Sequence, residues 1–183
     1  MAYFYFDFRD THKQHRLGLL ASLLSQLYVK SDPCFHIFSR LYFNHDEGAR
    51  QPSDDSLFEC LAEMLNVQGQ PEMYLIIDAL DVCPNISGMP TAREKVLEFV
   101  EDLVGLSLPS VHICVSSRPE FDIRGSLEPL APFRMLLDDE SGQKADISGY
   151  INSVVHSDRR MRNWSAENKK LVIDTLSDRA DGM

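Results

Sequence analysis

The sequence predicts an α/β fold with a mainly parallel β-sheet, followed by the start of a helical subdomain. Two runs, Met73–Ile77 and Val111–Ser117, are of continuous character, which is typical of parallel strands buried on both faces. A helical stripe between them, Val96–Val104, completes a β-α-β unit. Beyond a further strand expected at 133–137, two helical patterns follow with no strand between them. We therefore expect a three-layer α/β core at residues 1–143 and the start of a helical subdomain at 144–183.

The first predicted element is an aromatic strand at Ala2–Phe8, because Tyr and Phe are favoured in strands. Thr11 and Gln14 have the spacing of a capping box, which predicts a helix start. Leucines then recur at helical spacing through 17–28. The sequence thus predicts a long helix directly after the first strand.

Two more helices are expected before the first continuous run. Asp32 and Pro33 suggest an N-cap followed by proline at the first helical position, which opens an aromatic helix through Tyr42. Apolar residues at helical spacing over 57–65 predict another helix, with a stop near Gly69.

After residue 73, strand patterns and helix patterns alternate along the chain, and only helix patterns follow residue 137. Thr91 and Glu94 form a second capping box, at the start of the helix that joins the two apolar runs. A further strand is expected at 133–137, ending on Asp138 and Asp139. Helical stripes at 147–155 and 171–176 mark the helical subdomain.

Composition excludes several classes of function. The 183-residue chain has a net charge of -10 and no dense basic cluster, so it repels nucleic acid. No apolar run approaches the roughly 20 residues that span a bilayer, so no membrane partner is expected. The four cysteines are scattered without a C-x-x-C pair, which favours a reducing, cytoplasmic location.

Candidate functional residues stand where the two apolar runs end. Ligands of open α/β sheets gather at the carboxyl ends of the strands. One strand brings Asp78 to this edge, and the next brings Ser116, Ser117 and Arg118. A carboxylate suits Mg²⁺, usually through water, and a guanidinium matches phosphate oxygens. Spacing alone leaves an alternative open, in which Asp78 caps a loop and Arg118 is a surface arginine.

Four stretches in order, FYFDFRDTHKQ, MYLIIDALDVCP, VHICVSSRPEFDIR and ADISGYINSVV, resemble the landmarks of a fungal NACHT domain. This is the STAND-class P-loop NTPase module of NOD-like receptor proteins. The resemblance covers almost the whole chain. It implies a P-loop NTPase-like core, ATP or GTP with Mg²⁺ as cofactors, and a cytoplasmic role in signal transduction.

The resemblance also implies residue roles. Asp78 matches the Walker B acid that holds Mg²⁺ through water, and Arg118 matches the sensor 1 arginine that binds the terminal phosphate, with Ser117 beside it in the nucleotide site. Asp81 matches an acid that follows Walker B and is the candidate catalytic residue. The family commonly has Asp-Glu where this chain has Asp81-Val82, which removes a carboxylate that could orient the attacking water.

The sequence contains no G-x-x-x-x-G-K-[ST] motif, so Walker A is missing. The chain opens on a strand and stops within a helical pattern, so we expect a piece of a longer protein. The resemblance places the missing strand in the middle of the sheet, beside the Val111 strand. We therefore expect little or no nucleotide binding by this chain alone, and self-association through open strand edges.

Two functions follow from these expectations. The first is a fragment of a nucleotide-binding signalling switch, whose longer parent would bind nucleotide and form homo-oligomers. The second is a non-catalytic protein-interaction module derived from a degenerate NTPase. Asp78 and Arg118 favour the first function, whereas Val82 and the missing Walker A favour the second.

Overall fold

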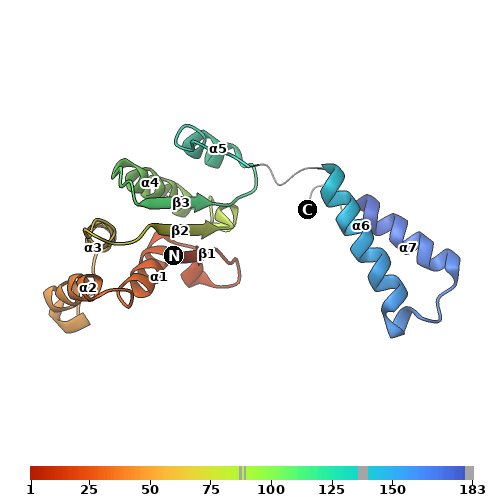
Figure 1. Cartoon of the computed structure of the whole chain (residues 1–183), viewed down its shortest axis with the longest axis horizontal. Coiled ribbons are helices and arrows are strands. Elements are labelled where there is room, and N and C mark those ends of the chain that lie inside the picture. The colour runs from red at the N-terminus through yellow and green to blue at the C-terminus, as the bar shows by residue number, and fades with distance from the viewer. Residues whose placement is uncertain (87, 89, 136–139, 180–183) are drawn as a thin grey trace. The chain divides into compact units, whose positions relative to one another are not determined.

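The computed structural model describes residues 1–86, 88, 90–135 and 140–179. The chain divides into two compact units, Met1–Pro132 and Phe133–Met183 (Figure 1). The first unit contains the sheet and every candidate site residue.

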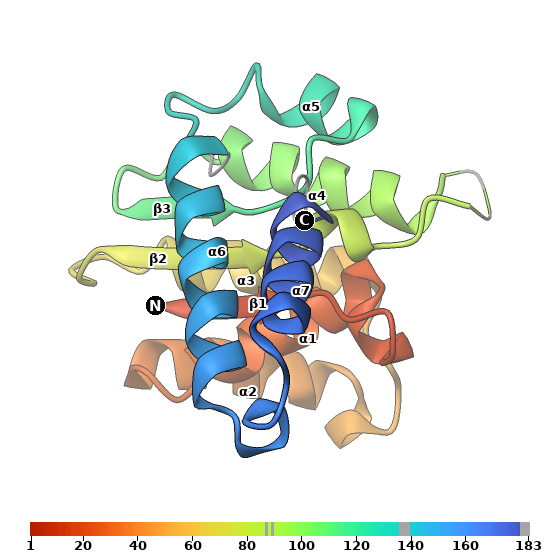
Figure 2. The same cartoon turned by 90° about the vertical axis from the view of Figure 1, so that its right-hand side faces the viewer.

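The first unit is built on a three-stranded parallel sheet in the order β1-β2-β3 (Figure 2). The register pairs Phe4 with Ile77, and Ile77 with Val115. This sheet confirms the predicted α/β class. Its strands are β1 (Ala2–Tyr5), β2 (Met73–Asp78) and β3 (Val111–Val115). Its helices are α1 (Arg16–Leu27), α2 (Asp32–Asn44), α3 (Asp54–Leu65), α4 (Ala92–Gly105) and α5 (Phe121–Leu127), with short 3-10 turns η1 (Thr11–Lys13), η2 (Asp46–Gly48) and η3 (Leu80–Val82).

Helices α1, α3 and α4 pack together on one face of the sheet (Figures 1 and 2). The rings of Phe58 in α3 and Phe99 in α4 meet edge to face at 5.8 Å, and the guanidinium of Arg16 in α1 lies about 6 Å from both rings. The connections from β1 to β2 and from β2 to β3 both move in the same direction across the sheet. Right-handed connections of this kind place their helices on the same face. The largest fully buried side chains include Leu19, Leu20, Leu23, Leu75, Ile77 and Phe99.

The opposite face of the sheet is exposed, which differs from the predicted three layers. Burial along β2 alternates residue by residue, so the expected burial of this strand on both faces is not found. The side chains of Tyr3, Tyr5 and Tyr74 are each about half exposed, and His112 stacks on Tyr74 with ring centroids 4.8 Å apart. A tyrosine such as Tyr74 counts as apolar in a sequence pattern even where it lies on an exposed face of the sheet. The continuous apolar pattern therefore overstated how deeply β2 is buried.

The two edges of the sheet differ. At the β1 edge, the side-chain amide of Gln26 accepts from the Tyr3 N–H at 3.0 Å and donates to the Tyr3 carbonyl at 2.6 Å. At the β3 edge, the N–H and C=O of Ile113 point away from β2 and have no partner among the described residues. The β1 edge is therefore capped at Tyr3, whereas the β3 edge is open at Ile113.

Two of the helix starts were placed well by the sequence. Thr91 caps α4, with its hydroxyl accepting from the Glu94 N–H and the Glu94 carboxylate accepting from the Thr91 N–H, so this capping box is confirmed. Helix α2 begins one residue earlier than expected. Its N-cap is Ser31, and Asp32 is already the first helical residue.

The predicted capping box at Thr11 is wrong. Thr11 lies in the short turn η1, which is capped by Asp10, and α1 starts only at Arg16. The Gln14 side chain instead donates to the carbonyls of Asp7 and Phe8. Gln14 thus ties down the chain that leaves β1.

The second unit is a helical hairpin of α6 (Glu140–Ser157) and α7 (Ala166–Arg179), with the turn η4 (Arg159–Met161) between them. Both helices expected at 147–155 and 171–176 are confirmed within these bounds. Of the strand predicted at 133–137, the described residues 133–135 form no strand, and 136–137 lie outside the described residues. Among the described residues, none of the helices has the length and apolar character needed to span a lipid bilayer.

Candidate functional site

Asp78 and Ser116 meet where β2 and β3 end. Asp78 is the last residue of β2, and the parallel register places Ser116 beside it. The Ser116 hydroxyl donates to one carboxylate oxygen of Asp78 and accepts from the Ala79 N–H at 3.1 Å. The candidate Walker B acid is therefore held by a side chain from the neighbouring strand end.

The backbone turns sharply directly after Asp78. Ala79 adopts a left-handed conformation (φ 56°), which is uncommon for a residue with a Cβ atom. The turn is held in place because Leu80 donates its N–H to the Ser116 carbonyl at 3.0 Å. Such strain persists only where neighbouring contacts support it, and it clusters at functional sites.

Asp81 and Arg118 form the second contact between the two strand ends. The Asp81 carboxylate accepts from the backbone N–H of Arg118 at 3.1 Å and lies 3.5 Å from the guanidinium Nε of the same residue. The Asp81 side chain is 13% exposed, whereas that of Arg118 is 82% exposed. The terminal guanidinium nitrogens of Arg118 have no hydrogen-bond partner in the described part of the chain, so they remain available to an anion.

Ser117, a predicted binding residue, lies at the same edge but faces its own backbone. Its hydroxyl donates to the carbonyl of Arg118 at 3.0 Å. Ser116, one residue earlier, makes the contact to Asp78 instead. Strand alternation was the signal that could have selected it, because the register that pairs Ile77 with Val115 places the next residues, Asp78 and Ser116, side by side.

Sequence reasoning also missed Arg93, which lies under this edge. Arg93 is buried, with Nε donating to the Cys83 carbonyl at 3.0 Å and Nη2 donating to the Asp81 carbonyl at 2.6 Å. Its Nη1 donates to the Asp122 carboxylate at 3.3 Å. A cation in the first turn of a helix is disfavoured by the helix dipole. That unusual position was the available signal for a special role.

The cysteine beside this network is chemically inert. Cys83 is fully buried, and burial raises the pKa of its thiol to about 12. Its sulfur contacts the Gln14 carbonyl at 3.3 Å. A neutral thiol is a poor nucleophile, so Cys83 serves packing rather than chemistry.

The donor set at this edge fits a magnesium ion held through water. The Asp78 carboxylate is exposed, and only one of its oxygens accepts from Ser116, so the other is free to accept from a metal-bound water. No group of three or more His, Cys, Asp or Glu side chains that could hold a metal occurs within the described residues.

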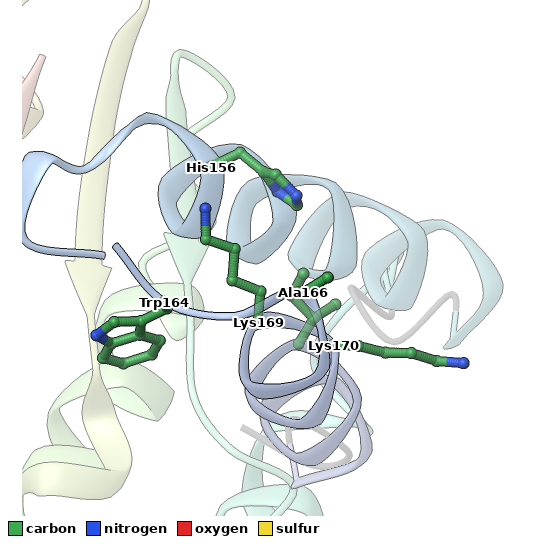
Figure 3. A pocket seen from close by; sticks show the side chains of 6 residues that line it. His156, Trp164, Ala166, Lys169 and Lys170 are labelled. Atoms are coloured by element: carbon green, nitrogen blue, oxygen red, sulfur yellow. The ribbon is translucent and has the colours of Figure 1, made fainter. Parts of the chain in front are cut away.

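Two hollows of the described structure lie away from this edge. A hollow of about 380 Å³ lies in the second unit, between the end of α6 and the start of α7 (Figure 3). It is lined by His156, Trp164, Ala166, Lys169, Lys170 and Ile173. A second hollow of about 420 Å³ lies beside α4 and is lined mainly by glutamates and Leu97. Neither of these hollows is lined by Asp78 or Arg118, and both residues are exposed, so the candidate site is an open rim.

Fold and site together define an α/β domain whose parallel strands bring two acids and an arginine to one edge. Residues 1–118 match the family described as "Nephrocystin 3, N-terminal". This match covers more than half of the chain, and the chain belongs to that family. It runs from β1 to Arg118 and so includes the whole sheet and the edge residues.

The matched family is not the NACHT family that the sequence motifs resemble. The NACHT identity is therefore a proposal. No curated protein and no solved structure matches the chain.

Proposed function

We propose that this chain is part of a nucleotide-binding signalling switch of the NACHT type, carrying the Walker B acid and the sensor arginine but not the Walker A cradle. One observation carries the proposal. Asp78 and Arg118 lie at the same edge of a parallel sheet, each tied to the opposite strand end, through Ser116 and Asp81 respectively. This is where open α/β sheets bind their ligands.

In this proposal each edge residue has a defined role. Asp78 would hold Mg²⁺ through water, and Arg118 would bind a terminal phosphate with its free guanidinium nitrogens. A bound Mg²⁺ supplies charge neutralisation at the phosphate oxygens. Asp81 acts here through Arg118, because its carboxylate is occupied by the N–H and Nε of that residue.

The proposal also implies that this chain alone binds nucleotide weakly. Backbone N–H groups and a lysine supply much of the phosphate affinity in P-loop proteins, and the sequence lacks that motif. Val82 stands where the resembled family commonly has Glu, so little or no hydrolysis is expected. The proposed location is the cytoplasm, which rests on the scattered, unpaired cysteines.

A titration with a fluorescent ATP analogue and Mg²⁺ tests this function. We expect weak binding by the whole chain that is further reduced in Asp78→Asn and Arg118→Gln. Asp174→Asn, an exposed acid of α7, is the matched control and should bind like the wild type. Tight binding, or weak binding that neither edge substitution reduces, would reject the proposal.

The exposed face of the sheet favours a second candidate, a non-catalytic module that associates with a second copy of itself. The open β3 edge has outward-pointing backbone groups at Ile113 and Val115. Two copies of this short strand could pair antiparallel about Ile113, which brings their exposed tyrosine faces into one surface. A chain with a net charge of -10 repels itself, so such pairing should strengthen with added salt.

Sedimentation of the whole chain at low and moderate salt tests this second candidate. We expect a dimer whose population falls in Cys114→Lys, since a lysine beside an open edge opposes strand pairing. Ser153→Lys on the exposed surface of α6 is the control. A monomer at every salt concentration would reject the candidate and leave the nucleotide proposal untouched.

A further inference from the structure

Arg93 contacts three separate segments around the candidate edge. It lies at the second position of α4, yet its guanidinium binds residues outside that helix. Nε and Nη2 donate to the carbonyls of Cys83 and Asp81, which belong to the loop after β2. Nη1 donates to the carboxylate of Asp122, in the first turn of α5. We name these four residues the arginine clamp.

The clamp has the properties of a specific anchor and not of a chance surface ion pair. The Arg93 side chain is 10% exposed and that of Asp122 is 31% exposed. Burying a guanidinium is costly unless its N–H groups are paired. Here all three of its nitrogens donate, two of them to backbone carbonyls, which only a planar fork can reach together.

Asp122 is itself held in place for this contact. The Asn85 side-chain amide donates to Asp122 at 2.9 Å, and the Thr91 hydroxyl donates to the Asn85 carbonyl oxygen at 3.0 Å. The cap of α4 therefore connects to the start of α5 through Asn85. Asn85 and Arg93 thus both donate to Oδ2 of Asp122, so the carboxylate is held by two side chains.

The clamp holds the chain segments on both sides of the contact between Asp81 and Arg118. Arg93 holds the backbone carbonyl of Asp81, whose carboxylate in turn accepts from the Arg118 N–H. Asp122 follows Arg118 by four residues, after Pro119, which restricts the intervening backbone. One buried guanidinium thus fixes both loops that present the pair, although the loops are 37 residues apart in sequence.

We propose that Arg93 is the positioning residue of this edge: it sets where Arg118 stands by fixing the Asp81 loop and the start of α5 at once. What this positioning serves, phosphate recognition by Arg118, rests on the proposed function. The positioning itself requires no nucleotide. It also implies that a shift of α4 moves both strand-end loops together, so α4 is the element through which this edge can be regulated.

Amide hydrogen exchange measured by NMR on the whole chain, without nucleotide, tests the inference. In Arg93→Gln we expect the Arg118 amide, which donates to Asp81, to exchange about tenfold faster or more, while the strand amides of β2 keep their protection. Arg93→Lys should restore only part of the protection, because an ammonium cannot reach all three partners at once. A merely structural role would accelerate all amides in parallel.

A matched control and a second variant keep the test decisive. Arg124→Gln removes an exposed arginine of α5 whose partner is Glu128, and it should leave the Arg118 amide unchanged. If Arg93→Gln does not fold, Asp122→Asn replaces it, since it keeps the two carbonyl contacts and weakens only the link to α5. That variant should accelerate the Arg118 amide selectively. Unchanged exchange in the folded variants, or uniform acceleration, would overturn the inference.

The outcome is independent of the nucleotide proposal. Selective acceleration together with an absence of ATP binding would keep the clamp and reject the proposed function. ATP binding that needs Arg118 but is insensitive to Arg93→Gln, with unchanged exchange, would keep the function and reject the clamp.

Discussion

The carboxylate of Asp81 accepts the backbone N–H of Arg118 at 3.1 Å, and this hydrogen bond joins the loops that follow two neighbouring parallel strands. The guanidinium of the same arginine adds only a long contact of 3.5 Å and is 82% exposed. Asp81 therefore fixes mainly the backbone of Arg118 and leaves its side chain free to bind another group.

Because Asp81 holds a backbone N–H and Arg118 makes only a long side-chain contact, we expect substitution of Asp81 to destabilise the protein more than substitution of Arg118. Asp81→Ala removes the acceptor of a backbone N–H and should lower the free energy of unfolding by about 1–2 kcal/mol. Arg118→Ala removes only a solvent-screened ion contact and should cost less than about 1 kcal/mol. Urea unfolding of both variants measures the order, and a larger loss in Arg118→Ala would contradict it.

A second prediction concerns Gly18 in α1. Alanine in place of glycine within a helix normally stabilises by up to about 1 kcal/mol. A Cβ atom at Gly18, however, would lie 1.8 Å from the His12 carbonyl oxygen. We expect Gly18→Ala to destabilise the fold by about 1–3 kcal/mol, because backbone must move to relieve the overlap.

Gly125→Ala in α5 is the matched control, since nothing lies within 4 Å of a Cβ built there. It should be neutral or slightly stabilising in the same urea experiment. Equal effects of the two substitutions would show that η1 does not approach α1 as described.

The cysteines should differ sharply in reactivity. Cys114 is exposed on the open face of the sheet, whereas the other three are buried. Burial raises the pKa of the Cys60 thiol to about 11 and that of Cys83 to about 12. With an aromatic disulfide reagent at pH 8, we expect one thiol to react quickly, and that reaction to disappear in Cys114→Ala. Fast reaction of a second thiol in the native protein would contradict the core packing.

The same burial predicts a loss of stability in alkaline solution. Below pH 9 the Cys83 thiol is neutral in both states, so it contributes no pH dependence. Above pH 9 the unfolded thiol ionises while the buried one stays neutral until about pH 12. Stability should therefore fall as pH rises through this window, by at most about 1.4 kcal/mol per pH unit for this thiol.

Lysines and tyrosines also titrate in alkaline solution, so variants are compared to isolate the contribution of Cys83 to the loss of stability. The free energy of unfolding of Cys83→Ala should fall less steeply between pH 9 and pH 11 than that of the wild type. Cys114→Ala should follow the wild type, because its thiol is exposed. Identical slopes for all three proteins would argue against the raised pKa of Cys83.

The Thr91 cap offers a local test of the helix that carries Arg93. Its hydroxyl satisfies the Glu94 N–H, and it also donates to Asn85. Thr91→Ala should cost about 1 kcal/mol for the lost cap. Thr91→Ser keeps both contacts and should recover most of that stability in thermal unfolding. A Thr91→Ala protein as stable as the wild type would contradict the capping box.

The candidate edge could be predicted from the sequence because each of its signals lies within one short stretch of residues. An apolar run that ends in Asp78, and a second that leads to Arg118, suffice to place both residues at one edge of a parallel sheet. The Thr91 capping box was equally readable, because its two residues lie within one turn. Ser117 was chosen instead of Ser116 because no strand register was available to separate adjacent serines.

Other features depend on contacts between distant segments. Arg93 meets Asp122 from 29 residues away, and Gln26 caps β1 from 23 residues away, so neither contact leaves a pattern in its own stretch of sequence. The exposed face was missed for a different reason. Tyr74 and Ile76 fit an apolar run whichever side of the sheet they face.

We propose that Asp78, Ser116 and Arg118 form one rim that recognises Mg²⁺ and phosphate. Mapping the backbone amide shifts of the whole chain by NMR during a titration with Mg²⁺-ATP tests it most directly. We expect the shifts to concentrate at these three residues and to disappear in Asp78→Asn. Shifts confined to other surfaces, such as the hollow around Trp164, or shifts that persist unchanged in Asp78→Asn, would contradict the claim.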